Sequence, residues 1–340
     1  MKLSGKLTPV AVLFLLVVGA VMAALAGCGQ NQERRTGAEQ AKQAEVVKVR
    51  LGMLPIIDNL PFWVAQEKGY FQAEGLDVEL ISFPSALERD SALTAGKIDG
   101  GVGDLLAVAT LRNSGTPVKA VSLAMGAQPG ESRFAVLSSP DSGIYKPDQL
   151  KNVEVAVSLN SVIEYTTDKL LEHQGLKPEE IKKVSIPKMP VRLEALLSGK
   201  VKAATLPDPL ATLAAIKGAH LVADTLNDNV AQTVIVLRED FLDKNQPAAE
   251  KLIKAYARAA GEISADPAAF QKTLTQKANV PEEVLTNSEH RLPVHFSAPQ
   301  LPTREQVQEV VGWLKEHNLI EKPFSYEELV DSRVIAGVKG

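Results

Sequence analysis

The sequence predicts an α/β protein made of two lobes, each a doubly wound sheet with helices on its faces. Two observations lead to this fold class. Strand-like and helix-like segments alternate between residues 46 and 237, and one short motif recurs at corresponding points of the two halves of that region. The chain has 340 residues, which is long enough to form two separate hydrophobic cores.

The N-terminal segment has the layout of an export signal, since Lys2 and Lys6 precede an apolar stretch over residues 9–26. The run Leu25-Ala26-Gly27-Cys28 is similar to a bacterial lipoprotein signal, in which the cysteine becomes the lipidated first residue. Cys28 is the only cysteine of the chain, so it has no partner for an internal disulfide. We expect a signal peptide over residues 1–27 and lipidation of Cys28. A plain transmembrane anchor is the alternative, because ~18 apolar residues can just span a bilayer.

The next segment, residues 28–45, is polar and has no apolar period, which predicts a flexible tether. The folded body is expected to begin near Val46. Acyl chains on Cys28 would hold that body to the cell membrane on its extracytoplasmic side.

The first half of the body alternates between strand and helix signals. Alternating apolar residues start at Val46, and glycines close most of the helical patterns. This spacing predicts a parallel sheet with helices on both faces. The expected strands are 46–52, 76–81, 98–102 and 118–124, and the expected helices are 62–68, 84–96 and 104–113.

The second half repeats the alternation and ends in a helix-rich tail. The expected strands are 134–137, 153–157, 184–186, 202–205, 221–223 and 233–237. The expected helices are 160–174, 190–198, 208–217, 247–264, 266–277, 303–317 and 325–331.

An internal echo links the two halves. The run ALTAGKI at residues 92–98 recurs as ALLSGKV at residues 195–201. In both runs a glycine ends a helical pattern and a β-branched residue opens the next strand. An aspartate follows within a few residues of each, Asp104 in the first half and Asp208 in the second. The echo predicts two equivalent lobes, although joints of this kind also recur by chance in α/β proteins.

Several of these segments resemble a known family. Residues 62–80, FWVAQEKGYFQAEGLDVEL, are similar to the opening signature of ABC-importer substrate-binding proteins of the NMT1/THI5-like and sulfonate–taurine–nitrate group. Residues 155–175 and the run Leu206-Pro207-Asp208-Pro209 are similar to later landmarks of the same family.

The resemblance implies a periplasmic-binding-protein fold of type II, with a ligand cleft between the lobes. Lobe I would comprise residues 46–132 and 233–340, and lobe II residues 133–232. The lobes would close by a hinge on a small molecule, which the protein would pass to the permease subunits of an ABC transporter.

The candidate site residues lie where predicted strands end and helices begin, because doubly wound sheets bind ligands at that edge. Ser85, Asn160 and Ser161 are equally well explained as helix caps. The aromatic candidates would stack on a ring if they face the cleft, although core packing is their commoner role. The candidate ligand-binding residues are Asp58, Asn59, Phe62, Ser85, Asp104, Met125, Asn160, Ser161, Tyr165 and Asp208.

The charge of the ligand stays open at this point. Helix N-termini favour an anion, and Arg133 and Arg192 lie near predicted cleft loops, where either would pair with a carboxylate. Carboxylates from Asp104 and Asp208 would instead repel a sulfonate or nitrate. That repulsion favours a neutral, zwitterionic or nitrogen-rich heterocyclic ligand.

Other function classes find less support. The formal charge of −4 argues against a nucleic-acid partner. We expect no cofactor and no metal, because Pro293 between His290 and His295 blocks a regular helix and no third ligand is evident. A lyase or synthase on the same fold is an alternative, as is a metal-binding or sensory lipoprotein, and we expect a monomer. The synthases of this fold carry a cysteine-rich motif, whereas the single cysteine here lies at the lipidation site.

Overall fold

The computed structural model describes residues 46–227 and 230–338. The predicted signal peptide, the tether and Cys28 therefore lie outside the described residues. Within the described ranges, no helix combines the length and the apolar character that crossing a membrane requires.

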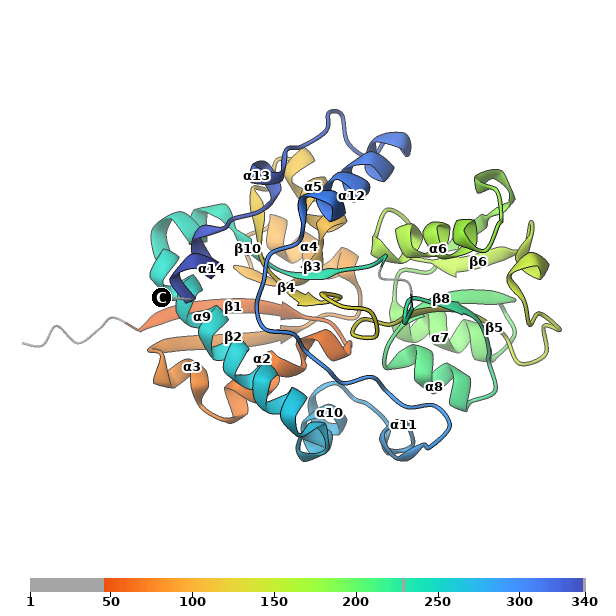
Figure 1. The fold of residues 1–340 in the computed structure, drawn as a ribbon, viewed down its shortest axis with the longest axis horizontal. Coiled ribbons are helices and arrows are strands. Elements are labelled where there is room, and N and C mark those ends of the chain that lie inside the picture. The colour runs from red at the N-terminus through yellow and green to blue at the C-terminus, as the bar shows by residue number, and fades with distance from the viewer. Residues whose placement is uncertain (1–45, 228–229, 339–340) are drawn as a thin grey trace, which may run out of the picture. The chain divides into compact units, whose positions relative to one another are not determined.

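The described chain forms two five-stranded sheets of the same design (Figure 1). The first has the order β2-β1-β3-β10-β4, and the second β7-β6-β8-β5-β9. The strands of the first sheet are β1 (Val47–Met53), β2 (Leu76–Ser82), β3 (Gly100–Asp104), β4 (Val118–Met125) and β10 (Thr233–Arg238). Those of the second are β5 (Phe134–Ser138), β6 (Glu154–Val157), β7 (Lys182–Ser185), β8 (Ala203–Pro207) and β9 (His220–Asp224).

Both sheets are mixed, which corrects the parallel sheet expected from the strand–helix alternation. Strand β10 lies antiparallel between β3 and β4, and β5 lies antiparallel between β8 and β9. Each of these strands follows a crossing between the sheets, so it enters its sheet from the opposite end. The α/β architecture with two lobes is otherwise as predicted.

Helices cover both faces of each sheet. The long helix α9 is kinked at Asn245, just before Pro247. Next to the first sheet and in the tail lie η1 (Ile57–Asn59), α2 (Leu60–Glu67), α3 (Tyr70–Ala73), α4 (Ala86–Thr94), α5 (Leu105–Asn113), α9 (Glu239–Ala265), η4 (Pro267–Phe270), α10 (Gln271–Lys277), α11 (Glu282–Thr286), α12 (Arg304–Glu316), α13 (Tyr326–Leu329) and α14 (Arg333–Val338). Next to the second sheet lie η2 (Pro147–Leu150), α6 (Val162–His173), η3 (Pro178–Glu180), α7 (Met189–Leu197) and α8 (Leu210–Ile216).

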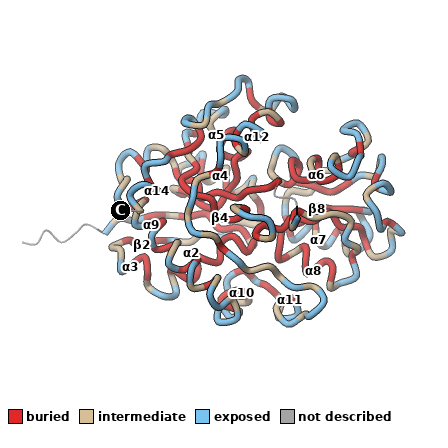
Figure 2. Tube along the Cα trace, in the orientation of Figure 1, coloured by how far each residue is buried: buried red, intermediate tan, exposed pale blue. Residues whose placement is uncertain are grey.

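Each sheet separates two hydrophobic cores, because successive strand residues point to opposite faces. In β10, Val234 and Val236 join the core under α5 and α12, whereas Ile235 and Leu237 join the core under α2 and α9. The two faces of β5 alternate in the same way. Buried residues accordingly follow the strands through both lobes (Figure 2).

The internal echo marks equivalent joints. Helix α4 ends before Gly96 and α7 before Gly199, and both glycines have positive φ, 65° and 71°. A left-handed residue of this kind ends a helix at little cost only when it is glycine. Strands β3 and β8 follow and take the same central position in their sheets.

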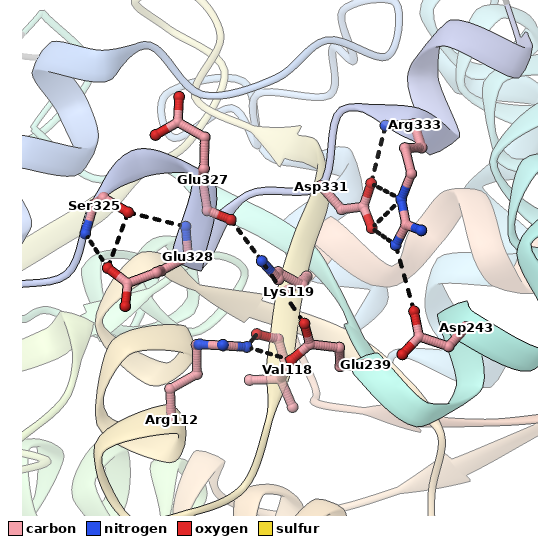
Figure 3. A network of polar contacts seen from close by, with 10 residues as sticks. All are labelled: Arg112, Val118, Lys119, Glu239, Asp243, Ser325, Glu327, Glu328, Asp331 and Arg333. Carbon is pink, nitrogen blue, oxygen red and sulfur yellow. Dashed lines mark hydrogen bonds and ion pairs between the residues drawn. The ribbon is translucent and has the colours of Figure 1, made fainter.

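Charged groups attach the C-terminal helices to the first sheet (Figure 3). Lys119 on β4 donates to the backbone carbonyl of Glu327 in α13 at 2.5 Å, and its Nζ lies 3.9 Å from Glu239 at the start of α9. Arg333 in α14 lies 3.7 Å from Asp243 of α9. The tail helices therefore pack with the first sheet.

Candidate functional site

A pocket lies between the two sheets, with walls from both. Its empty volume is about 490 Å³, a figure that includes open solvent at the mouth. Six residues of the first-sheet wall are Leu54, Ile56, Ala86, Arg89, Asp104 and Thr233. Six of the second-sheet wall are Phe134, Ser158, Ser161, Met189, Arg192 and Pro207.

The pocket lies at the carboxyl ends of parallel strands, where helices begin. Asp104 ends β3 and caps α5, accepting a hydrogen bond from the Ala107 N–H at 2.8 Å. Ser161 caps α6 in the same way through the Ile163 N–H, and Ser85 caps α4. The partial positive charge of these helix ends is therefore directed toward the pocket.

The sequence-predicted residues divide into three groups. Asp104 and Ser161 lie on the pocket wall, and Ser85 lies next to the wall residue Ala86. Phe62, Met125 and Tyr165 are buried in the hydrophobic cores and are not among the wall residues. Asp58, Asn59, Asn160 and Asp208 are not among the wall residues, although Asn160 and Asp208 are next in sequence to the wall residues Ser161 and Pro207.

Asp58 supports the wall from behind. Its carboxylate accepts a hydrogen bond of 2.5 Å from the hydroxyl of Thr233, which does line the pocket. Burial raises the pKa of Asp58 to about 6, and the Thr233 hydrogen bond opposes that rise.

Asp208 is already paired within the protein. Its Oδ1 accepts hydrogen bonds from the N–H and the hydroxyl of Thr212, at 3.0 and 2.8 Å. Its Oδ2 lies 3.9 Å from Arg133, which also pairs with Asp224 at 3.0 Å. Arg133 therefore supplies one positive charge for two carboxylates, and within the described residues Oδ2 of Asp208 makes no hydrogen bond.

Asp104 is the carboxylate on the pocket wall. Burial raises its pKa to about 6, against the opposing effects of the Arg89 guanidinium and the Ala107 hydrogen bond. Its charge is thus partly offset by a neighbouring cation and by the start of α5, which weakens the repulsion that the sequence led us to expect toward an anion.

Two arginines line the pocket, one from each lobe. Arg192 of α7, already noted from the sequence, is fully buried. Arg89 of α4, which the sequence did not single out, is 2% exposed. The length of the arginine side chain lets a residue one turn inside a helix reach a site at the start of that helix.

The lobes also touch each other around the pocket. The Met189 N–H donates to the Pro84 carbonyl at 3.4 Å, and Lys188 lies 3.5 Å from Glu88. Farther along α6, Tyr165 packs edge-on against Trp313 of α12, with ring centroids 5.5 Å apart. The two lobes therefore enclose the pocket from both sides.

Two crossings connect the sheets, between β4 and β5 and between β9 and β10. In the described parts of these crossings, the Thr225 hydroxyl donates to the Ser132 carbonyl at 2.8 Å. Buried Glu131 accepts a hydrogen bond from Ser297, which belongs to the long segment before α12 (Figure 1).

Comparison with known proteins decides the family. The model of the family described as NMT1/THI5 like matches residues 57–270, more than half of the chain. The protein belongs to the NMT1/THI5-like family. The resemblance found in the sequence, through the segment 62–80, is thereby confirmed.

This NMT1/THI5-like chain has both synthases and binding proteins among its relatives. It is 23% identical over 287 residues to the 4-amino-5-hydroxymethyl-2-methylpyrimidine phosphate synthase THI13 of Saccharomyces cerevisiae, covering 78% of this chain and 81% of that protein. It is 30% identical over 162 residues to the bicarbonate-binding protein CmpA of Synechococcus elongatus, covering 43% of this chain and 34% of CmpA.

Solved structures confirm the fold. The alkanesulfonate-binding protein SsuA from Xanthomonas axonopodis pv. citri, bound to MOPS, matches with a TM-score of 0.72 at 19% identity, over 84% of this chain and 99% of SsuA. The periplasmic nitrate-binding protein NrtA from Synechocystis PCC 6803 matches with a TM-score of 0.67 at 15% identity, over 87% of this chain and 86% of NrtA. The predicted periplasmic-binding-protein fold is thus borne out.

Proposed function

We propose that this protein is the substrate-binding component of an ABC importer and captures a small organic molecule between its lobes. The observation that carries the proposal is the pocket itself, whose walls come from both lobes. A ligand in such a pocket contacts both halves, so binding favours the closed arrangement of the lobes.

The relatives support binding rather than catalysis. SsuA, NrtA and CmpA are named for the molecules they bind, and two of them share this fold over nearly their whole length. The yeast synthases are enzymes. The cysteine-rich motif expected of such synthases is absent from this sequence, whose single cysteine lies at position 28.

The localisation is part of the proposal. The protein is lipidated at Cys28 and held on the extracytoplasmic face of the membrane, where it meets its permease partner as a monomer. Replacing Cys28 with alanine should release the protein from membranes in a fractionation assay. Unchanged retention of the Cys28→Ala protein would remove the lipoprotein claim.

The function is tested by a thermal-shift screen of the soluble chain without its signal peptide, against sulfonates, pyrimidines, vitamins and amino acids. A ligand at 100 times its Kd adds about 2.7 kcal/mol to the free energy of unfolding, which is easily seen as a shift of Tm. Mass spectrometry of the recovered ligand then separates the two classes of function. An unaltered ligand supports a binding protein, whereas a product would favour an enzyme.

A further inference from the structure

The charge of the proposed ligand can be argued from the two arginines of the pocket. Arg192 is fully buried, and its guanidinium is held by backbone carbonyls only: Nε donates to Thr205 at 2.9 Å and Nη1 to Ile186 at 2.7 Å. Nη2 has no hydrogen-bond partner within the described ranges. Burial alone acts on this group and lowers the pKa of Arg192 to about 10. A buried cation with a free donor is costly unless an anion joins it.

Arg89 is the counterpart of Arg192 in the other lobe. The echo of the two halves extends back from the glycine joint, because Arg89 precedes Ala92-Leu93 as Arg192 precedes Ala195-Leu196. The environments correspond as well. Arg89 donates to the carbonyl of Val102 on β3, thirteen residues later, as Arg192 does to Thr205 on β8.

One position breaks the symmetry. Arg89 pairs with its neighbour Asp90, with Nη2 and Oδ1 2.7 Å apart, whereas the residue after Arg192 is Leu193. The first lobe therefore supplies a carboxylate for its arginine, although Nη2 of Arg89 also makes no hydrogen bond in the described part of the chain. Within the described residues, the second lobe supplies no carboxylate for Arg192. Arg192 itself lines the pocket, so a ligand there lies within reach of its guanidinium.

The rest of the pocket is mostly apolar. Leu54, Ile56, Phe134, Ile163 and Met189 contribute hydrophobic surface to its walls. A small inorganic anion would leave these side chains without a contact, so the anionic group has to belong to a molecule with a hydrocarbon part.

We propose that the ligand is a small organic acid in its monoanionic form, with its carboxylate or sulfonate bound by Arg192 and its apolar part against these walls. This inference rests on the proposed function, because it specifies the ligand of that same pocket. It selects the sulfonate-like class over the uncharged nitrogen heterocycle. The second lobe leaves its arginine unpaired so that the ligand completes the ion pair when the lobes meet.

The first test compares matched probes by isothermal titration calorimetry on the unaltered protein. Butanesulfonate and pentanoate carry a negative charge. Pentanamide has nearly the shape of pentanoate but no charge, pentylammonium carries a positive charge, and 4-aminopyrimidine represents the nitrogen heterocycles. We expect binding of at least one anion and about tenfold to a hundredfold weaker binding of the amide, the value of one buried charged hydrogen bond.

The second test uses variants that change the charge around Arg192. Leu193→Asp supplies the carboxylate that Asp90 gives to Arg89, and it should weaken anion binding about tenfold or more, whereas Leu193→Asn should change it less than about twofold. Arg192→Met should cause a loss at least as large. Arg258→Met, on the exposed face of α9, serves as the surface control. Circular dichroism of each variant establishes that it is folded. If Arg192→Met does not fold, the comparison of Leu193→Asp with Leu193→Asn still tests the inference.

Three results would overturn the inference. They are equal binding of pentanamide and pentanoate, equal anion affinity of Leu193→Asp and Leu193→Asn, and no binding of either anion. If 4-aminopyrimidine binds while the anions do not, the inference fails and the proposed function stands. If no molecule of this panel or of the wider screen binds, the proposed function fails with it.

Discussion

Replacing Asp104 with asparagine should stabilise the protein at neutral pH. Asp104 is buried on the pocket wall, and burial raises its pKa from the ordinary 3.8 to about 6. A folded-state pKa above the unfolded one means that the native protein binds the proton more tightly. This carboxyl group therefore favours the native state most at low pH, and its contribution falls as pH rises from about 4 to about 6.

The magnitude follows from the difference between the two pKa values. At 1.36 kcal/mol for each pH unit, the ionised group costs about 3 kcal/mol at pH 7.5 and about 1 kcal/mol at pH 4.5. Asparagine is uncharged at both pH values and caps a helix as well as aspartate does, so it retains the hydrogen bond from Ala107. Asp104→Asn should thus gain about 2 kcal/mol more stability at pH 7.5 than at pH 4.5.

The assay is urea unfolding of both proteins at the two pH values, followed by circular dichroism. Asp240→Asn is the control, because its exposed carboxylate accepts a hydrogen bond from Arg238, which lowers its pKa. That variant should lose a little stability at pH 7.5 and none at acid pH, the opposite sign. The reasoning is refuted if Asp104→Asn changes stability equally at both pH values, or if it destabilises the protein at pH 7.5.

Three further predictions concern packing and ion pairs. Gly101→Ala should lower the free energy of unfolding by about 3 kcal/mol, because its Cβ would lie 2.4 Å from the carbonyl oxygen of Gly52. Gly261→Ala in α9 is the control, since open space surrounds its Cβ, and it should raise the free energy of unfolding by about 0.5–1 kcal/mol; both are measured by thermal unfolding. Arg133→Met should lower the free energy of unfolding by about 3 kcal/mol in urea, because Asp208 and Asp224 then lose the cation that pairs with them. No loss of stability would show that these ion pairs add nothing. Tyr165→Ala should cost about 3–5 kcal/mol and speed hydrogen exchange in α6 and α12, since Tyr165 is a buried second-lobe residue in a core of the first lobe; exchange that changes in α6 alone would contradict the contact.

Local sequence patterns predicted most elements of the fold within a few residues. The helix expected over 160–174 is α6, Val162–His173, and the strand expected over 118–124 is β4, Val118–Met125. Apolar periodicity and glycine joints carry this information because both act within one element.

The order of the strands could not be predicted in the same way. The place of β10 between β3 and β4 depends on backbone hydrogen bonds between segments more than a hundred residues apart. A strand buried on both faces has the same apolar pattern whether its neighbours run parallel or antiparallel, so its direction left no signal in the sequence.

The candidate site was predicted only as far as backbone position determines it. Asp104 and Ser161 lie on the pocket wall because each begins a helix at a strand end. Their contact with a ligand stays a prediction. Phe62 also lies near the start of a helix, but its ring points into the core, and its centroid lies 4.9 Å from that of the Tyr256 ring. The direction of a side chain from a helix depends on tertiary packing, which the pattern does not contain.

The two pocket arginines occupy equivalent positions of the internal repeat. Neither Arg89 nor Arg192 stands in a loop, and each alone has the appearance of an ordinary helix residue. Aligned through the echo, they occupy one position of a repeated unit, and the two copies differ at the next residue, Asp90 or Leu193. If the two halves arose as equal copies, this substitution sets the two walls apart. Arg89 has the carboxylate of Asp90 beside it, and under our proposal the anionic group of the ligand takes the corresponding place beside Arg192. The internal repeat thus identifies Asp90 and Leu193 as the position at which two otherwise equivalent arginine environments differ.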